Sequence, residues 1–360
     1  MPKFDPKFLK LFLLLLVLYL FLLSIDLLSA SFKLFGKDFA EQLIVSTSNP
    51  LVGLIIGILA TSIIQSSSTT TSILVTLVGA GAISVYNAVP IVMGANIGTT
   101  VTNILVSLAH IGRKDEFEKA LAGATVHDFF NLLAVMVLVP LQLITGFLSA
   151  SAAFLANLFQ NIGGLKFASP IKIVVQPLKQ LIVELSGESG IIVLIIALIL
   201  LFLALHYLVK ILKSIVLIRI EAFFDRYIFK TTARSMAFGL ILTAIIQSSS
   251  VTTSLVIPLI AADILKLEQV FPYMLGANVG TTITAILAAL ATGEVTAITV
   301  SFTHLLFNIS GIAFLLPLKK IPISLARLLA RLSMKNRLIP IAFVLITFFI
   351  LPFSLLYLTR

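Results

Sequence analysis

The stretch GILATSIIQSSSTTTS, residues 57–72, holds the feature that decides how this chain is built. From Thr61 to Ser72, ten of the twelve side chains carry a hydroxyl or an amide. No Lys, Arg, Asp or Glu occurs between Gln42 and Gly112, so nothing charged lies nearby in sequence. A dense group of neutral polar side chains inside an apolar segment therefore needs an explanation.

The composition places this segment in a membrane. The chain has 360 residues, of which 59% are hydrophobic and 11% charged, and its mean hydropathy is +1.15. A soluble domain usually carries about 25% charged residues. A helix needs about 20 apolar residues to cross a bilayer, and the candidates are residues 8–29, 88–109, 118–146, 188–212, 270–292, 295–317 and 338–358. We predict an all-α polytopic membrane protein of the plasma or inner membrane. The chain has no cysteine, which excludes disulfides and thiolate metal sites.

The polar stretch recurs, and the sequence around it recurs with it. GLILTAIIQSSSVTTS at 239–254 repeats it at an offset of 182, and GANIGTT (94–100) is matched by GANVGTT (276–282) at the same offset. Between 57–109 and 239–291, 25 of 53 positions are identical. A third pair, HDFFN and HLLFN, begins at His127 and His304. The chain therefore contains two copies of one repeated unit.

The two segments with polar centres, 51–83 and 234–263, are each long enough for two half-helices that meet at a turn. We predict that both are re-entrant hairpins, which enter and leave on one side of the membrane. Three spans then separate equivalent points of the two copies, and this odd number turns the second copy upside down. Inverted repeats with interrupted helices are typical of secondary transporters, whose substrate site lies at the midplane.

The predicted organisation has four parts. Each repeat contains a span, a hairpin, a broken span and a closing span. The parts are a first repeat (1–146, with hairpin 51–83, broken span 88–109 and span 118–146), an outer connecting segment (147–187), a second repeat (188–318, with hairpin 234–263, broken span 270–292 and span 295–317), and an interfacial basic segment with the final span (319–360).

The charge distribution predicts a cytoplasmic N-terminus. With this orientation 19 basic residues lie inside and six outside, as the positive-inside rule requires, so the net charge of +10 does not call for nucleic acid. The basic stretches 213–232 and 319–336 mix charge with apolar residues, and we expect amphipathic helices along the inner interface. Polyanion binding is the alternative for them. The basic, leucine-rich N-terminus resembles a signal peptide, but its apolar run is long, so we expect it to be retained.

The hairpin tips are suited to an anion. Where one half-helix ends and another begins, free N–H groups and the helix dipole favour negative charge, and serine hydroxyls and glutamine amides add donors. The predicted anion ligands are Gln65, Ser66, Ser67, Ser68, Gln247, Ser248, Ser249 and Ser250.

The GANxGTT segments are suited to a small cation. Their glycines, at 94, 98, 276 and 280, allow the helix to unwind, and freed carbonyls with polar side chains offer hard oxygen ligands suited to Na⁺. The predicted side-chain ligands are Asn96, Thr99, Thr100, Asn278, Thr281 and Thr282. Two plainer interpretations stay open: hydroxyls that bond back to the i−4 carbonyl, and glycines that form a close-packing face between helices. Anion donors beside cation ligands indicate a cation-coupled anion carrier.

Asp128 is the acidic residue of the repeat cores. It lies about 15 Å into its span at 1.5 Å per residue, and an acid at that depth marks an ion path by default. The second copy has Leu305 at this position. We expect hydrogen bonds from His127, Asn131, His304 and Asn308 to brace the broken helices. These residues are too few for a transition-metal site, and without a thiol, paired core carboxylates or a P-loop we expect no enzyme activity.

At these residues the chain resembles the type II sodium-dependent phosphate cotransporters, solute carrier family 34 and its prokaryotic relatives. The resemblance rests on QSSSxTTS followed by GANxGTT in both copies and on AGATVHDFFN (122–131), and it covers roughly 50–318. It implies sodium-driven import of inorganic phosphate by alternating access, with phosphate held by the two QSSS tips. It also implies sodium sites that draw on the hairpins, including Thr252, on the broken helices and on Asp128, with Na⁺ as coupling ion and no other cofactor.

Two other functions remain open from the sequence. The first is sodium-coupled transport of another oxyanion or a dicarboxylate, and the second is an anion channel or a phosphate-sensing membrane receptor. The expected partners are inorganic phosphate, sodium ions and the lipid bilayer, without nucleic acid, and a homodimer is left open. The outer segment 147–187 is short and lacks cysteines, unlike that of the animal members, so their regulation is not carried over.

Overall fold

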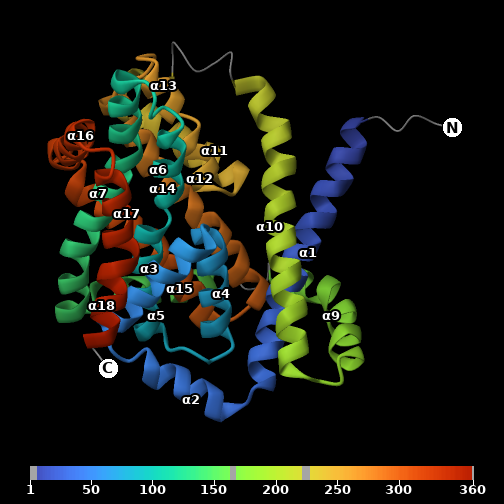
Figure 1. Ribbon diagram of the computed structural model, residues 1–360. Coiled ribbons are helices and arrows are strands. Elements are labelled where there is room, and N and C mark those ends of the chain that lie inside the picture. Colours follow the sequence, from blue (N-terminus) through green and yellow to red (C-terminus); the bar gives the residue numbers. More distant parts are fainter. Residues whose placement is uncertain (1–5, 163–167, 221–227, 359–360) are drawn as a thin grey trace.

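The computed structural model describes residues 6–162, 168–220 and 228–358, and over these residues every long element is a helix (Figure 1). The helices, in chain order, are α1 (Pro6–Leu34), α2 (Lys37–Ser46), α3 (Pro50–Ile64), α4 (Ser67–Gly79), α5 (Val85–Gly98), α6 (Val101–Leu108), α7 (Lys114–Thr145), α8 (Phe147–Asn161), α9 (Ala168–Leu185), α10 (Gly190–Ile220), α11 (Thr232–Ile246), α12 (Ser249–Ser254), α13 (Ile257–Ala261), α14 (Leu267–Thr292), α15 (Val295–Leu315), α16 (Lys320–Lys335), α17 (Ile339–Leu345) and α18 (Leu351–Leu358). A 3₁₀ turn (Ile228–Lys230) precedes α11, and a π-helical turn (Ile346–Ile350) joins α17 to α18.

Seven helical stretches among the described residues are long and apolar enough to cross a membrane. They are Lys10–Leu34, Val85–Leu108, Lys114–Thr145, Gly190–Leu208, Leu267–Thr292, Val295–Leu315 and Ile339–Leu358. Each coincides with one of the seven predicted spans to within a few residues. The prediction of an all-α polytopic membrane protein is confirmed.

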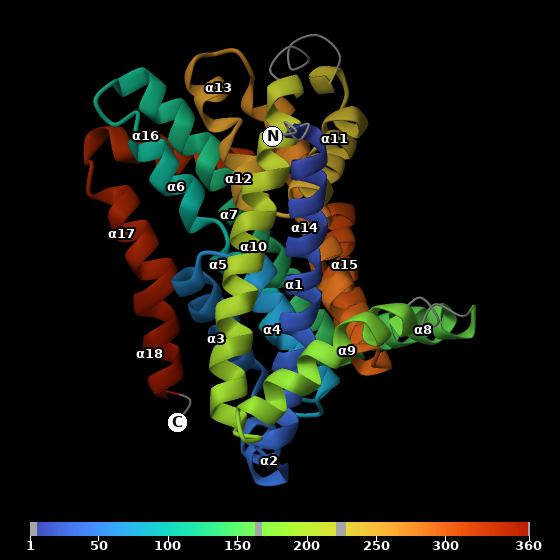
Figure 2. The same cartoon turned by 90° about the vertical axis from the view of Figure 1, so that its right-hand side faces the viewer.

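The two segments with polar centres are each divided at the QSSS sequence. In the first, α3 ends at Ile64 and α4 begins at Ser67, and in the second, α11 ends at Ile246 and α12 begins at Ser249. The pair α3–α4 lies toward the end of the bundle that carries α2, whereas α11–α13 lie toward the end that carries α16 (Figures 1 and 2). The two polar turns therefore approach the middle of the bundle from opposite ends.

Glycines set the closest helix contacts, between α3 and α5 and between α11 and α14. A Cβ atom on Gly94 would overlap the carbonyl oxygen of Leu54, and one on Gly276 would overlap that of Met236. The two backbones touch directly, as small residues permit between membrane helices. Of the two interpretations of these glycines, the close-packing face is the one found.

The prediction of a broken second span, 270–292, is wrong, because α14 is continuous from Leu267 to Thr292. Its glycines keep the helical conformation and serve the contact with α11 instead. In the first copy the helix is interrupted only at Thr99 and Thr100, which separate α5 from α6 and keep φ angles of −74° and −87°. The two GANxGTT segments therefore differ in structure despite nearly identical sequences.

The basic segments also differ from each other. The stretch predicted at 319–336 forms α16, which packs on α7 through Ile323, Ala326 and Ala330. The separate amphipathic helix predicted over 213–232 is wrong in its described part, because residues 213–220 continue α10. Residues 221–227 of that prediction lie outside the described residues, and α11 begins at Thr232.

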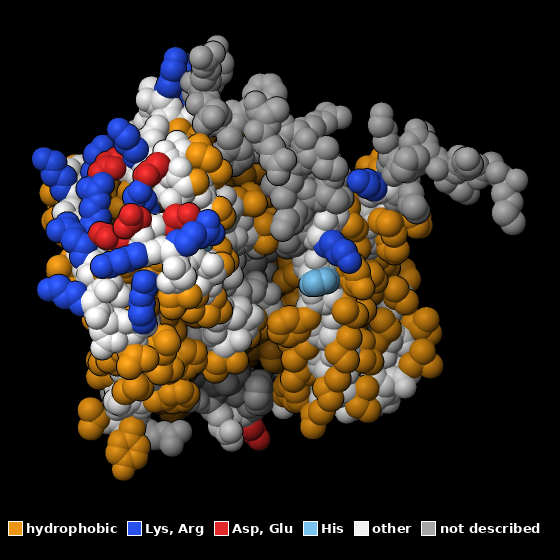
Figure 3. Space-filling model, turned by 45° about the horizontal axis from the view of Figure 1, so that its top comes forward, with side chains coloured by type: hydrophobic (Ala, Val, Ile, Leu, Met, Phe, Trp, Pro, Cys, Tyr) orange, Lys and Arg blue, Asp and Glu red, His pale blue; other side chains and the backbone are white. Residues whose placement is uncertain are grey.

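The remaining elements flank this centre. The outer connecting segment holds α8 and α9, and α10 runs alongside α1 (Figure 2). Lys and Arg side chains gather at the end of the bundle that carries α16, where Lys266, Arg327 and Arg331 are exposed (Figure 3).

Candidate functional site

The two QSSS turns have the same geometry. Gln65 and Gln247 both adopt the left-handed conformation with a φ of 59°, which ends the first helix of each pair. The next residue, Ser66 or Ser248, then caps the second helix, and its hydroxyl oxygen accepts a hydrogen bond from the N–H three residues on, at 3.2 or 3.3 Å. Serine is a favoured N-cap, which explains why each turn begins a new helix there.

Each glutamine is held by a threonine of the GANxGTT region in its own copy. The Thr102 hydroxyl donates to Oε1 of Gln65 at 2.9 Å, and the Thr284 hydroxyl donates to Oε1 of Gln247 at 2.7 Å. The glutamine Nε2 groups donate to the backbone carbonyls of Ser62 and Ala244. These bonds hold both turns in place, so both amides support the tips.

Both tips line one pocket of about 560 Å³. The first tip contributes Ser66, Ser68 and Thr69, and the second contributes Gln247 and Ser248. The described lining residues include no Asp or Glu. Two sequences that lie 182 residues apart therefore present hydroxyl and amide groups to a shared space, as the internal repeat predicts.

Helix α10 forms the third wall of this pocket. It contributes Phe202, Leu205, His206 and Lys210. Sequence reasoning missed His206 and Lys210 because they lie outside the repeated motifs. Phe202, His206 and Lys210 are spaced four residues apart, and this spacing alone indicates that they share one face of the helix.

A second polar group surrounds Asp128 at the interruption between α5 and α6. Among the described residues Asp128 is the only buried acidic side chain, and its Oδ1 accepts a hydrogen bond from the Thr100 hydroxyl. Its Oδ2 has no hydrogen-bond partner within the part of the chain that the structure describes. The residue that precedes Thr100 is Thr99, whose hydroxyl donates to that of Ser67 at 3.1 Å, and this bond joins the group to the first tip.

The histidine and asparagine pairs bridge the two copies. His127 Nε2 donates to Oδ1 of Asn278 at 2.5 Å, and Asn278 donates to Oδ1 of Asn131 at 3.0 Å. In the other direction, His304 and Asn308 donate to Oδ1 of Asn96 at 3.3 and 3.4 Å. Each pair thus hydrogen-bonds the asparagine of the opposite copy's GANxGTT segment.

The predicted second-copy cation ligands do not gather in the same way. The hydroxyls of Thr252, Thr281 and Thr282 bond back to carbonyls of their own helices, at 2.7, 3.0 and 2.7 Å. Two predicted anion ligands of the second copy, Ser249 and Ser250, are not among the residues that line the pocket at the two tips: Ser249 is buried, and its carbonyl accepts from Thr253, whereas Ser250 is half-buried. Local bonding, the plainer interpretation, describes these threonine hydroxyls.

Asn103 was also missed, and it connects the copies. The Thr253 hydroxyl donates to its Oδ1 at 3.0 Å, which ties α12 to α6. The second copy has Ala285 at this position. In the sequence, the only indication of a special role for Asn103 is that the second copy has alanine at the aligned position.

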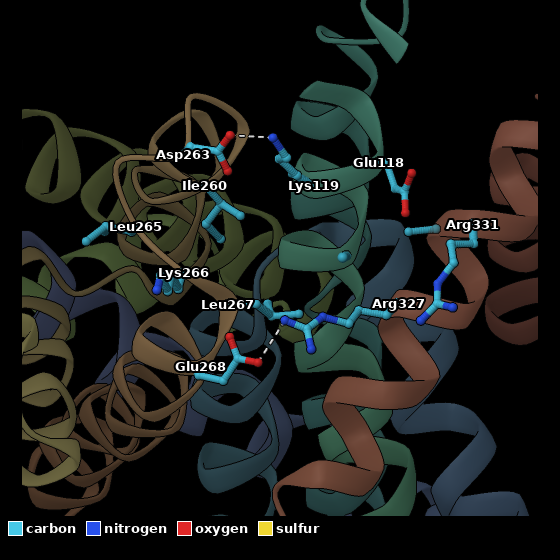
Figure 4. Close-up of a pocket in the computed structure, with 12 residues that line it drawn as sticks. Glu118, Lys119, Ile260, Asp263, Leu265, Lys266, Leu267, Glu268, Arg327 and Arg331 are labelled. Carbon is cyan, nitrogen blue, oxygen red and sulfur yellow. Dashed lines mark hydrogen bonds and ion pairs between the residues drawn. The ribbon is translucent and has the colours of Figure 1, made fainter. Parts of the chain in front are cut away.

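A further pocket, of about 470 Å³, lies between α7, α14 and α16 and is lined by charges of both signs (Figure 4). Lys119 pairs with Asp263, and Arg327 pairs with Glu268 at 2.7 Å. Exposed pairs of this kind stabilise a fold little, because water and salt screen them. Glu118, Lys266 and Arg331 line this pocket as well, so it presents charges of both signs, whereas the pocket at the two tips is lined mainly by neutral hydrogen-bonding groups.

Comparison with known proteins agrees with this geometry. The model of the Na⁺/Pi-cotransporter family matches residues 20–168 and 199–356, most of the chain. The chain belongs to the Na⁺/Pi-cotransporter family. Both polar tips lie within the matched ranges, so the family similarity includes the residues that line the shared pocket.

Individual members of the Na⁺/Pi-cotransporter family are similar over nearly the whole chain. Sodium-dependent phosphate transport protein 2A of Mus musculus is 34% identical over 98% of this chain and 68% of its own length. Sodium-dependent phosphate transport protein 2B of Homo sapiens is 32% identical over 96% of this chain and 64% of its own length. No solved structure gives a significant match.

Proposed function

We propose that this chain is a sodium-coupled secondary transporter that imports inorganic phosphate by alternating access. The observation that carries the proposal is the pocket lined by both QSSS tips. Membership of the Na⁺/Pi-cotransporter family supports the choice of substrate and coupling ion, since the similar proteins are named as sodium-dependent phosphate transport proteins.

The hydroxyl geometry supports anion binding at the tips. Ser66 Oγ accepts hydrogen bonds from the backbone N–H and the hydroxyl of Thr69, at 3.2 and 2.9 Å. A hydroxyl has two acceptor positions and one donor, so the Ser66 O–H is left to donate. Ser68 and Ser248 line the same pocket, and hydrogen bonds from such donors to an anion are stronger than neutral ones.

The group at Asp128 supports a sodium site. A buried carboxylate oxygen without a partner is costly, and a bound cation would satisfy it. The hydroxyls of Thr99 and Thr100 supply further hard oxygens nearby. We place the coupling ion here, with Asn96 in its surroundings, and assign Asn278 to bracing.

The arrangement of the two tips supports inverted repeats and alternating access. The helix pairs that carry them lie toward opposite ends of the bundle (Figure 1). We propose that the end with α16 faces the cytoplasm, because 19 of the 25 basic residues fall on that side in the predicted topology. Both helix pairs would then be re-entrant, the first from outside and the second from inside.

Uptake into membrane vesicles tests the function. We expect an inward sodium gradient to drive phosphate accumulation above equilibrium, and a sodium ionophore to abolish it. Arsenate should compete with phosphate, whereas sulfate and succinate should not. Phosphate accumulation that does not depend on sodium would contradict a sodium-coupled carrier. Phosphate flux that occurs only down the phosphate concentration gradient would contradict it as well.

Ser68→Ala is expected to raise the phosphate concentration for half-maximal uptake about tenfold, since losing a hydrogen bond to a charged group costs about 1.5–3 kcal/mol. Ser68 lines the pocket without capping a helix, so its loss tests binding apart from folding. Ser248→Ala should show a similar increase. Ser301→Ala, a buried serine bonded to its own helix, is the matched control. Unchanged phosphate affinity in Ser68→Ala and Ser248→Ala would assign the tips a structural role.

A further inference from the structure

The pocket at the two tips is charged on one side only. Its neutral donors come from the hairpins, whereas His206 and Lys210 come from α10. With Phe202 these residues repeat every four positions, so they form one face of the helix. Lys210 is exposed, and its ammonium lies 5.8 Å from the ring centroid of Tyr207.

The charged face extends in a defined direction. From Phe202 to Lys210 the lining residues run toward the end of α10 that lies near α11 and the N-terminus of α1 (Figures 1 and 2). This is the end of the bundle that we propose faces the cytoplasm. The pocket is therefore lined by Lys210 on its cytoplasmic side, beyond the tips.

The first copy has no counterpart to this face. When the offset of 182 is continued to the preceding spans, His206 corresponds to Ser24 and Lys210 corresponds to Leu28. Both Ser24 and Leu28 are fully buried in α1. If α1 lines the outer path of phosphate as α10 lines the cytoplasmic path, the outer path has neutral side chains at these positions. The cytoplasmic path has a cationic side chain there.

We propose that Lys210, assisted by the ring N–H of His206, forms an anion-attracting wall on the cytoplasmic path of phosphate and raises the affinity for phosphate on that side alone. This inference rests on the proposed function and orientation. A charge in a cleft concentrates counter-ions and accelerates their association, and salt weakens the effect. Lys210 thereby sets how strongly cytoplasmic phosphate rebinds to the site. Phosphate that rebinds there slows further uptake.

The test compares the two faces of the protein. Right-side-out and inside-out membrane vesicles are prepared from cells that express the chain, and their sidedness is checked by labelling a Lys335→Cys marker, because the chain has no native cysteine. For Lys210→Gln we expect the half-saturating phosphate concentration at the cytoplasmic face to rise about threefold or more at low salt. At the outer face it should stay unchanged. Lys210→Arg should restore the cytoplasmic value.

Lys114→Gln is the matched control, since Lys114 is an exposed lysine at the start of α7 outside the pocket. Absence of sodium-driven uptake by the unmodified protein would refute the proposed function itself. If the unmodified protein transports and Lys210→Gln leaves the cytoplasmic affinity unchanged, the inference is overturned. An equal loss of affinity at both faces would overturn it as well, because that pattern indicates a general defect.

A lipid headgroup presents the same phosphate chemistry to Lys210, so a second arm distinguishes the two sources. Binding of labelled inorganic phosphate is measured on purified protein in a neutral detergent with sodium. Weaker binding by Lys210→Gln under these conditions supports direct contact with inorganic phosphate. A difference that occurs only in membranes containing anionic lipid would assign Lys210 to the lipid and overturn the proposal.

Discussion

Replacing Asp128 with asparagine is expected to remove one sodium ion and one elementary charge from each transport cycle while phosphate uptake continues at a reduced rate. Asp128 is the only buried acid among the described residues, and its Oδ2 has no hydrogen-bond partner. A buried, unpaired carboxylate costs several kcal/mol, and a bound cation offsets that cost. Asparagine keeps an acceptor for the Thr100 hydroxyl and removes the charge that attracts the ion.

The measurement pairs phosphate-evoked current with isotope uptake in the same cells or vesicles. The ratio of charge to phosphate should fall by one in Asp128→Asn. Leu305→Asn, which introduces the same amide at the equivalent position of the second copy, should leave the ratio unchanged. If current and uptake decline in proportion in Asp128→Asn, the residue is not a separable coupling site.

Gly94→Ala and Gly276→Ala are each expected to reduce the amount of folded protein to about a tenth or less. The added Cβ would overlap a backbone carbonyl oxygen, that of Leu54 or Met236, and a backbone atom cannot move aside as a flexible side chain can. Overpacking typically costs about 1–3 kcal/mol, and more where the backbone must shift. Helices α3 and α11 each lead into a polar tip, and the supporting threonines lie in α6, directly after α5, and in α14, so the change spreads to the site.

Size-exclusion chromatography in detergent and the midpoint of thermal unfolding measure this effect. Gly112→Ala is the control, because no atom lies within 4 Å of its added Cβ and its backbone does not need glycine. We expect the control to keep the yield and the midpoint of the unmodified protein. A midpoint within about 2 °C of the unmodified protein in both test variants would contradict direct backbone contact.

The sequence by itself determined the spans, the internal repeat and the two polar turns. Hydropathy decides which segments cross a bilayer, because unpaired backbone in hydrocarbon is too costly and a helix pairs all of its own backbone groups. The turns followed from local chemistry as well. A serine after a glutamine that accepts the left-handed conformation caps a new helix, and this happens in the same way at Ser66 and Ser248.

Only the tertiary structure decided how nearly identical motifs are used. The glycines of GANIGTT and GANVGTT make the same close contacts, with α3 and with α11, yet the first helix is interrupted at Thr99 and Thr100 and α14 stays continuous. The partners of Asn96 and Asn278 lie in the opposite copy, and no spacing along the chain reveals such a pairing. Lys210 is likewise unremarkable in sequence, and only the packing of α10 against both tips places its charge at the pocket. Contacts between segments far apart in the chain depend on the shape of the whole bundle, which local propensity does not encode.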